Sequence, residues 1–172
     1  HSGAAAIYKH PRNVPDDLIK KLAAKGGVIQ VNAYNAYMID VPANADRDKA
    51  LAAIQAKYRG RRLTEADVVA QTAERRAVLA QYPIPRANFD DLMKHMMHVI
   101  KLVGVDHVGF SGDFDGGGGI DGFNSVADYP AVTEYLLKNG YTKEDVAKIW
   151  GGNVLRVLRE TEAYAKSQQA GG

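Results

Sequence analysis

The chain has 172 residues, 46% apolar and 24% charged, and its 22 basic and 20 acidic side chains give a net charge of +2. This composition predicts one globular domain, while the weak charge argues against nucleic acid and the lack of an apolar run near roughly 18 residues argues against a membrane span. Cysteine is absent, so disulfides and thiolate metal sites are excluded, and any metal ligand must be His, Asp or Glu.

Helical and strand patterns alternate in the first half of the chain. Pro15 and two aspartates early, with Gly26 and Gly27 late, are typical of a helix. A second helix opens with Thr64 and Asp67, a variant of the capping box. The predicted elements are a helix over 14–25, a strand over 28–31, and helices over 45–58 and 64–82.

The second half continues the alternation. Its predicted elements are a helix over 87–103, a strand over 105–111, and helices over 128–138, 142–150 and 154–166. Asn153 is expected to cap the last helix, and residues 167–172 are expected to form a loose tail. The apolar side chains expected to face inward from that helix are Val154, Leu155, Val157 and Leu158.

Strands separated by helices predict a helix-rich α/β fold with parallel pairing through crossovers. Only two strands are clear, with a third ending near His1, which is too few for a complete doubly wound sheet or barrel. The chain begins without Met and without a helix start. We therefore expect it to be the later part of a larger α/β fold, with residues upstream of His1.

Three segments follow strands and are expected at one rim, since ligands bind at the carboxyl ends of parallel strands: residues 1–2, 32–37 and 113–115. The third belongs to GDFDGGGG, where acids precede glycines and no helix follows. This order argues against a phosphate loop. Either the segment is a polar turn, or a strand-end aspartate serves as a general acid or base.

The histidines have structural and functional interpretations. His1, at a strand end, is either a metal ligand or a surface residue. His95 and His98 stand three apart on a helix and are interpreted as satisfied or surface residues rather than a metal bridge. His107 lies at the wrong end of its strand for catalysis, and His10 is unassigned.

Arg12 and two tyrosines complete the candidate residues. Arg12 follows a predicted strand, where it is either a solvated charge or a bidentate clamp for a substrate carboxylate. Tyr34 and Tyr37 either line a pocket or pack at the rim. Spacing alone leaves these alternatives open.

Taken together, these segments resemble the membrane (renal) dipeptidase family of zinc peptidases. The resemblance covers nearly the whole chain apart from predicted inserted helices at 42–86. Its motifs are HS at 1–2, RNVPDDLI at 12–19, GGVIQVNAYNAY at 26–37, HMMH at 95–98, VDHVGFSGDFDG at 105–116 and ADYPAVTEYLLKNGYTKEDVAKIWGGNVLRVLRE at 127–160.

The resemblance implies a TIM-like (β/α)8 barrel with two zinc ions at its carboxyl rim, of which this chain would supply about strands six to eight with their helices. His1 would bind one zinc, and Arg12 would hold the substrate's terminal carboxylate. Asp113 would be the catalytic proton-transfer residue, and Tyr34 and Tyr37 would lie near the dipeptide. Asp115 would only support the loop.

The family's remaining metal ligands have no counterpart here: a His-x-Asp pair, a bridging glutamate and a further histidine. By itself the chain is thus expected to be inactive, with the N-terminal half supplied upstream or as a separate chain. A homo-oligomer is expected, and a periplasmic or secreted location is favoured over the cytoplasm. The alternatives are another amidohydrolase-like metal hydrolase, an inactive fragment, or a copper site at an N-terminal His1.

Overall fold

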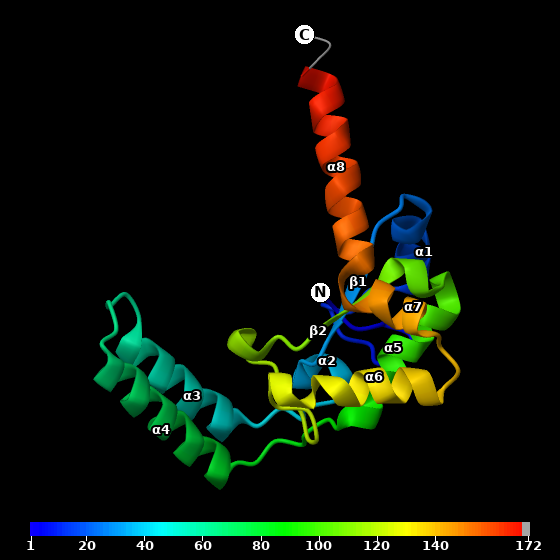
Figure 1. The fold of residues 1–172 in the computed structure, drawn as a ribbon. Helices are drawn as coiled ribbons and strands as arrows, with labels where there is room; N and C mark the ends of the chain where they lie inside the picture. The colour runs from blue at the N-terminus through cyan, green and yellow to red at the C-terminus, as the bar shows by residue number, and fades with distance from the viewer. Residues whose placement is uncertain (170–172) are drawn as a thin grey trace. The chain divides into compact units, whose positions relative to one another are not determined.

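The computed structural model describes residues 1–169, which form two compact units (Figure 1). The smaller unit, Val41–Pro85, contains two helices packed against each other, α3 (Ala45–Tyr58) and α4 (Glu65–Gln81). The predicted capping box of α4 is confirmed, because Thr64 and Asp67 exchange hydrogen bonds with each other's backbone N–H. Whether these helices are an insertion relative to the family stays a prediction.

The larger unit combines His1–Asp40 with the chain from Arg86 onwards. Its strands are β1 (Ile29–Asn32) and β2 (Val108–Ser111). Its α-helices are α1 (Asp16–Ala24), α2 (Asn35–Met38), α5 (Phe89–Val103), α6 (Tyr129–Lys138), α7 (Lys143–Ala147) and α8 (Asn153–Gln169). Shorter turns occupy Val105–His107, Phe114–Gly116, Val126–Asp128 and, as a π-helix, Lys148–Gly152.

The two strands pair in parallel, as predicted, with Ile29 opposite Val108 and Asn32 opposite Ser111. The amide of Ser2 donates to the Gln30 carbonyl at 3.0 Å, so the first residues also run beside β1. The ends of three chain segments therefore meet at one rim. The predicted strand over 105–111 is shorter than expected, because residues 105–107 form a 3-10 turn.

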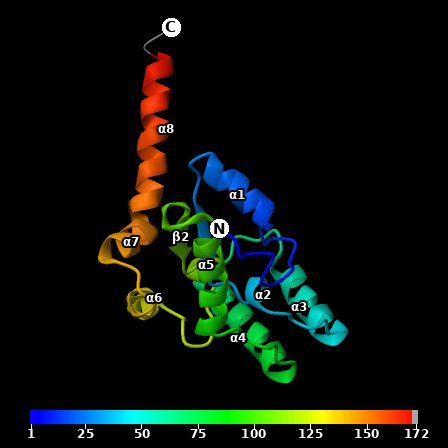
Figure 2. The ribbon, with the colours of Figure 1, turned by 90° about the vertical axis from the view of Figure 1, so that its right-hand side faces the viewer.

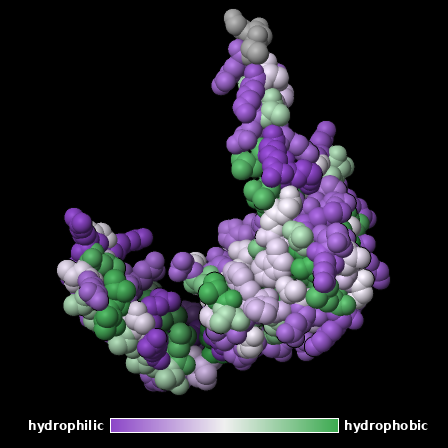
Figure 3. All heavy atoms as spheres, viewed as in Figure 1, coloured by the Kyte–Doolittle hydropathy of each residue, from purple (hydrophilic) through white to green (hydrophobic). Residues whose placement is uncertain are grey.

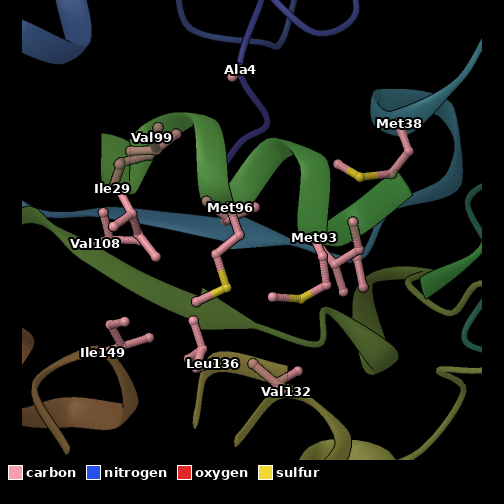
Figure 4. Close-up of a cluster of buried hydrophobic side chains, with 14 of the residues drawn as sticks. Ala4, Ile29, Met38, Met93, Met96, Val99, Val108, Val132, Leu136 and Ile149 are labelled. Atoms are coloured by element: carbon pink, nitrogen blue, oxygen red, sulfur yellow. The ribbon is translucent and has the colours of Figure 1, made fainter. Parts of the chain in front are cut away.

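The core lies between α5, the strands and α6 (Figures 2 and 4). Apolar residues recur along α5 at helical spacing, and its buried apolar residues are Leu92, Met93, Met96, Val99 and Ile100. Figure 4 shows Met93 and Met96 pointing from α5 towards the side of Val132 and Leu136. A capping box formed by Asn88 and Asp91 fixes where α5 begins.

The last helix differs from its prediction. Val154, Leu155 and Leu158 are 43%, 48% and 52% exposed, so the expected inward apolar face of α8 is wrong for this chain (Figure 3). Instead, Val154 and Leu158 line a groove of about 430 Å³ with Val28 of the segment before β1.

The expected cap at Asn153 is also wrong. The buried Asn153 amide donates to the carbonyls of Val105 and Val108, at 2.6 and 2.8 Å, which anchors α8 to the start of β2. Helix α8 continues through Gln169, and the rest of the predicted loose tail over 167–172 lies outside the described residues. Within residues 1–169, none of the helices has the length and apolar character that crossing a bilayer requires.

Candidate functional site

Three polar side chains meet where the N-terminal segment, β1 and β2 end. The Asp113 carboxylate accepts a hydrogen bond from the Asn32 amide, with Nδ2 and Oδ2 3.0 Å apart. The same Oδ2 lies 3.8 Å from Nε2 of His1. The His1 side chain is 50% exposed and that of Asp113 is 18% exposed, so the pair lies at an accessible rim above the buried Asn32. The structure thus brings together His1 and Asp113, which the sequence placed at separate strand ends.

A tight glycine turn fixes the backbone of Asp113. Asp113 has a left-handed conformation (φ 53°), the only described non-glycine residue with positive φ. Its carbonyl accepts hydrogen bonds from the amides of Gly116 and Gly118, at 3.0 and 2.6 Å. A Cβ on Gly118 would clash with the Gly112 carbonyl and lie 2.6 Å from that of Asp113. The glycines are therefore needed for close packing of the turn.

The residue after Asp113 anchors this turn in the core. The Phe114 ring stacks on Phe123 and on Tyr129, with centroids 5.5 and 5.9 Å apart. Asp115, in contrast, is exposed and makes no hydrogen bond or ion pair within the described part of the chain. The expected support of the loop by Asp115 is thus not observed, and the glycine amides and Phe114 provide it instead.

An aromatic cluster lies beside the glycine turn. The rings of Tyr34 and Tyr37 have centroids 4.6 Å apart, and the Arg12 guanidinium lies 5.6 Å from the Tyr37 centroid. A Cβ on Gly117 would lie 3.4 Å from the Tyr34 ring, so the cluster and the Asp113 turn are neighbours. Arg12 is exposed and has no ion-pair partner among residues 1–169. This arrangement leaves a planar cation available to a carboxylate.

His10 belongs to the same cluster, although the sequence left it unassigned. Its ring lies 4.9 Å from that of Tyr37, and its Nδ1 accepts the Arg12 amide at 3.1 Å. The buried Asn13 locks the Arg12 loop in place, since its amide donates to the carbonyls of Tyr8 and Tyr37 at 2.8 Å and accepts from the Gly3 amide at 3.0 Å.

His95 holds the segment that carries His1. Its fully buried ring accepts the Ala4 amide at Nδ1, 2.9 Å away, which requires a neutral imidazole protonated at Nε2. Among the described residues, no group forms a hydrogen bond of good geometry with that Nε2. The Met38 carbonyl lies near it and favours the protonated ring, which raises the pKa. Burial is the dominant effect and lowers the pKa of His95 to about 4.

The other histidines do not add to the rim. His98 pairs with Asp16 of α1 at 2.8 Å, as expected for a satisfied helix histidine. His107 contacts the Gly27 carbonyl at 2.9 Å, before β2 and at the end of the sheet away from Asp113. Within residues 1–169, no three His, Asp or Glu side chains converge in a way that could hold a metal ion. His1 and Asp113 therefore do not form a complete metal site by themselves.

Sequence reasoning missed Asn32, Asn13 and His10. Asn32 stood in a segment expected at the rim, and its position directly after an apolar strand was the available signal. The partners of Asn13 and His10 combine near residues of the same loop, such as Tyr8 and Arg12, with the distant Tyr37, and no sequence motif indicates that combination.

In this chain, polar side chains gather at the carboxyl ends of two parallel strands. This arrangement is typical of the class of α/β proteins that bind ligands at such a rim. The sequence profile of the family described as membrane dipeptidase (peptidase family M19) matches residues 1–172. The chain therefore belongs to the membrane dipeptidase family.

Individual relatives agree with this family. Dipeptidase tcpJ of Claviceps purpurea is 31% identical over 170 residues, which are 98% of this chain and 30% of that protein. Dipeptidase aclJ of Aspergillus oryzae is 30% identical over 97% of this chain and 30% of that protein. The chain thus spans about a third of the length of these relatives.

Solved structures share the fold. The probable dipeptidase PvdM from Pseudomonas aeruginosa is 31% identical with a TM-score of 0.65, covering 91% of this chain and 42% of PvdM. A metallo peptidase from Rhodobacter sphaeroides, liganded with a phosphinate mimic of the dipeptide L-Ala-D-Ala, has a TM-score of 0.61 at 20% identity. The match covers 92% of this chain and 34% of the metallo peptidase chain. At 20% identity, the likeness concerns the fold alone.

Proposed function

We propose that this chain carries the carboxyl-terminal part of a metal-dependent dipeptidase site, on the later strands of a (β/α)8 barrel. The observation that carries the proposal is the approach of Asp113 to His1 at the strand ends, beside a cluster that presents the exposed cation of Arg12. Family membership supports the reaction class, and the metallo peptidase neighbour with a bound dipeptide mimic supports a metal and a dipeptide substrate.

The site needs partners from outside the described residues. The chain covers 30% of the dipeptidase from Claviceps purpurea, and the sheet formed by the described residues contains two strands. The exposed apolar residues of α8 are consistent with burial by a further part of the barrel. We infer that the remaining part of the barrel, which includes its N-terminal half, lies upstream or on a second chain. Intact mass and N-terminal sequencing of the protein from its source test this, and a mature protein that begins at His1 with no partner chain would contradict it.

The candidate site residues of this chain bind the substrate or transfer a proton. Arg12 binds the C-terminal carboxylate of the dipeptide bidentately, while Tyr37 supports the guanidinium from its ring face. Tyr34 and Tyr37 border the substrate. Asp113 accepts a proton from the attacking water and passes it to the leaving nitrogen.

The metal site needs donors from outside the described residues. His1 offers one imidazole and Asp113 one carboxylate, which are too few donors for a zinc site. Two zinc ions, with the missing ligands supplied by the other half, would polarise the peptide carbonyl and activate water when bound.

The direct test is hydrolysis of L-Ala-L-Ala, L-Ala-D-Ala and the tripeptide L-Ala-L-Ala-L-Ala by the intact protein, with metal content measured in the same sample. Hydrolysis of dipeptides but not of the tripeptide is expected, because Arg12 selects a carboxylate one residue beyond the scissile bond. A protein that binds zinc but cleaves no dipeptide would favour another amidohydrolase-like hydrolase.

A further inference from the structure

We infer that Asn32 is a positioning residue that orients the Asp113 carboxylate for proton transfer. This inference rests on the proposed role of Asp113, and it begins with where Asn32 lies. Asn32 is the last residue of β1 and is fully buried. It is a polar residue between two buried apolar neighbours, Val31 and Ala33. A buried amide is retained at a cost unless it is hydrogen-bonded.

The only described partner of the Asn32 side chain is Asp113. Its Nδ2 donates to Oδ2 at 3.0 Å, a bond across the sheet between residues 81 positions apart in the chain. Because an ionised carboxylate only accepts, Asp113 also fixes which way the amide points. The amide oxygen is then left buried without a partner among residues 1–169. Among the described residues, the Asn32 side chain is therefore held through Asp113 alone.

Asp113 is held at its backbone and at its side chain. Gly116 and Gly118 donate to its main-chain carbonyl, and its side chain reaches Asn32 of β1 from a left-handed backbone. Asn32 then holds Oδ2, the oxygen that faces Nε2 of His1. A strained backbone combined with a fixed carboxylate is typical of a functional position rather than a simple turn.

If Asn32 only packed in the core, its replacement would have a different effect. The replacement would lower the stability of the protein but would not change turnover by the molecules that remain folded. Asn153 provides the matched control, because it is a buried asparagine that donates only to backbone carbonyls, at the start of β2.

The kinetic test compares Asn32→Ala with Asn153→Ala in the intact protein, using L-Ala-D-Ala. Loss of a hydrogen bond to a charged group predicts that Asn32→Ala lowers kcat by about 10- to 100-fold, with KM changed less than about threefold. Asn153→Ala should leave kcat per folded molecule within about twofold of the parent. Equal kcat values in the two variants would overturn the positioning role.

A second measurement does not depend on activity or on the folding of Asn32→Ala. In NMR spectra of the intact protein, Asp113→Ala should shift the Asn32 side-chain amide, whereas Asp115→Ala should not. An unmoved amide in Asp113→Ala would refute the contact. The absence of dipeptidase activity in the parent would instead refute the proposed function, and the amide shift would still report the contact.

The exchange variant Asn32→Asp/Asp113→Asn tests whether turnover depends on the location of the carboxylate or only on its hydrogen bond to an amide. Asn32→Asp alone places a buried carboxylate beside the partly exposed carboxylate of Asp113 and should destabilise the protein. The exchange restores a carboxylate–amide pair and should recover stability, while turnover stays low because the carboxylate now belongs to β1. Recovery of full turnover by the exchange would show that the location of the carboxylate is unimportant and would overturn the inference.

Discussion

Acidification should weaken the fold through His95. The neutral ring accepts the Ala4 amide, and a protonated ring would place two N–H donors against each other. Because the folded-state pKa of about 4 lies below the ordinary 6.5, the unfolded chain binds the proton first. The stabilisation is complete above pH 6.5 and is lost as the pH falls towards 4.

The size of this loss of stability follows from the difference between the pKa of His95 in the folded protein and its ordinary value. A difference of about 2.5 pH units corresponds to on the order of 3 kcal/mol at 25 °C. Burial sets its sign, while the Met38 carbonyl and Asp91 oppose it, and His98 and Lys94 add to it. A loss of this size is a substantial fraction of a typical domain's stability.

Urea unfolding between pH 4 and 7 measures the loss in the intact protein. His95→Gln keeps an acceptor for Ala4 but removes the titration, so its stability should fall less on acidification than that of the parent. His98→Gln, on the same helix, is the control and should retain the His95-dependent loss. An NMR titration that places the pKa of the His95 ring above 6 would refute the reasoning, as would identical pH slopes in the parent and His95→Gln.

Three further substitutions test the rim in the intact protein. Asp113→Asn should lower kcat on dipeptides by at least about 100-fold while metal content stays near that of the parent, and unchanged turnover would exclude its proton-transfer role. Arg12→Lys should raise KM by about tenfold with little change in kcat, since a point charge cannot form the planar clamp; loss of metal at constant KM would contradict this. Gly118→Ala should cost about 1–3 kcal/mol in urea unfolding because its Cβ meets the Gly112 and Asp113 carbonyls. Gly151→Ala is the control and should cost less, because a Cβ at Gly151 would meet no atom within 4 Å.

Local patterns in the sequence predicted most elements of the fold. Helix α3 has the predicted bounds, and the predicted capping box at Thr64 and Asp67 is present. Such features depend on residues three or four positions apart, whose geometry is fixed once a helix forms. Parallel pairing also followed from the sequence, because a helical crossover between two strands leaves little alternative.

Long-range placement was predicted less well. The apolar residues of α8 were assigned an inward face, yet Leu155 and Leu158 are about half exposed, because periodicity identifies a face but not what lies against it. The same applies to Asn153, whose sequence context resembles a cap but whose amide reaches the carbonyls of Val105 and Val108 at the start of β2.

The sequence by itself determined which chemical groups stand at strand ends: His1, Asp113, and an arginine with two tyrosines in loops. Only the tertiary structure decided that Asn32 holds Asp113 and that His95 holds the segment bearing His1. The physical reason is strand register. A hydrogen bond between residues 81 positions apart exists only when Asn32 lies opposite Ser111, and that register is set by burial of the whole sheet rather than by either residue's neighbours.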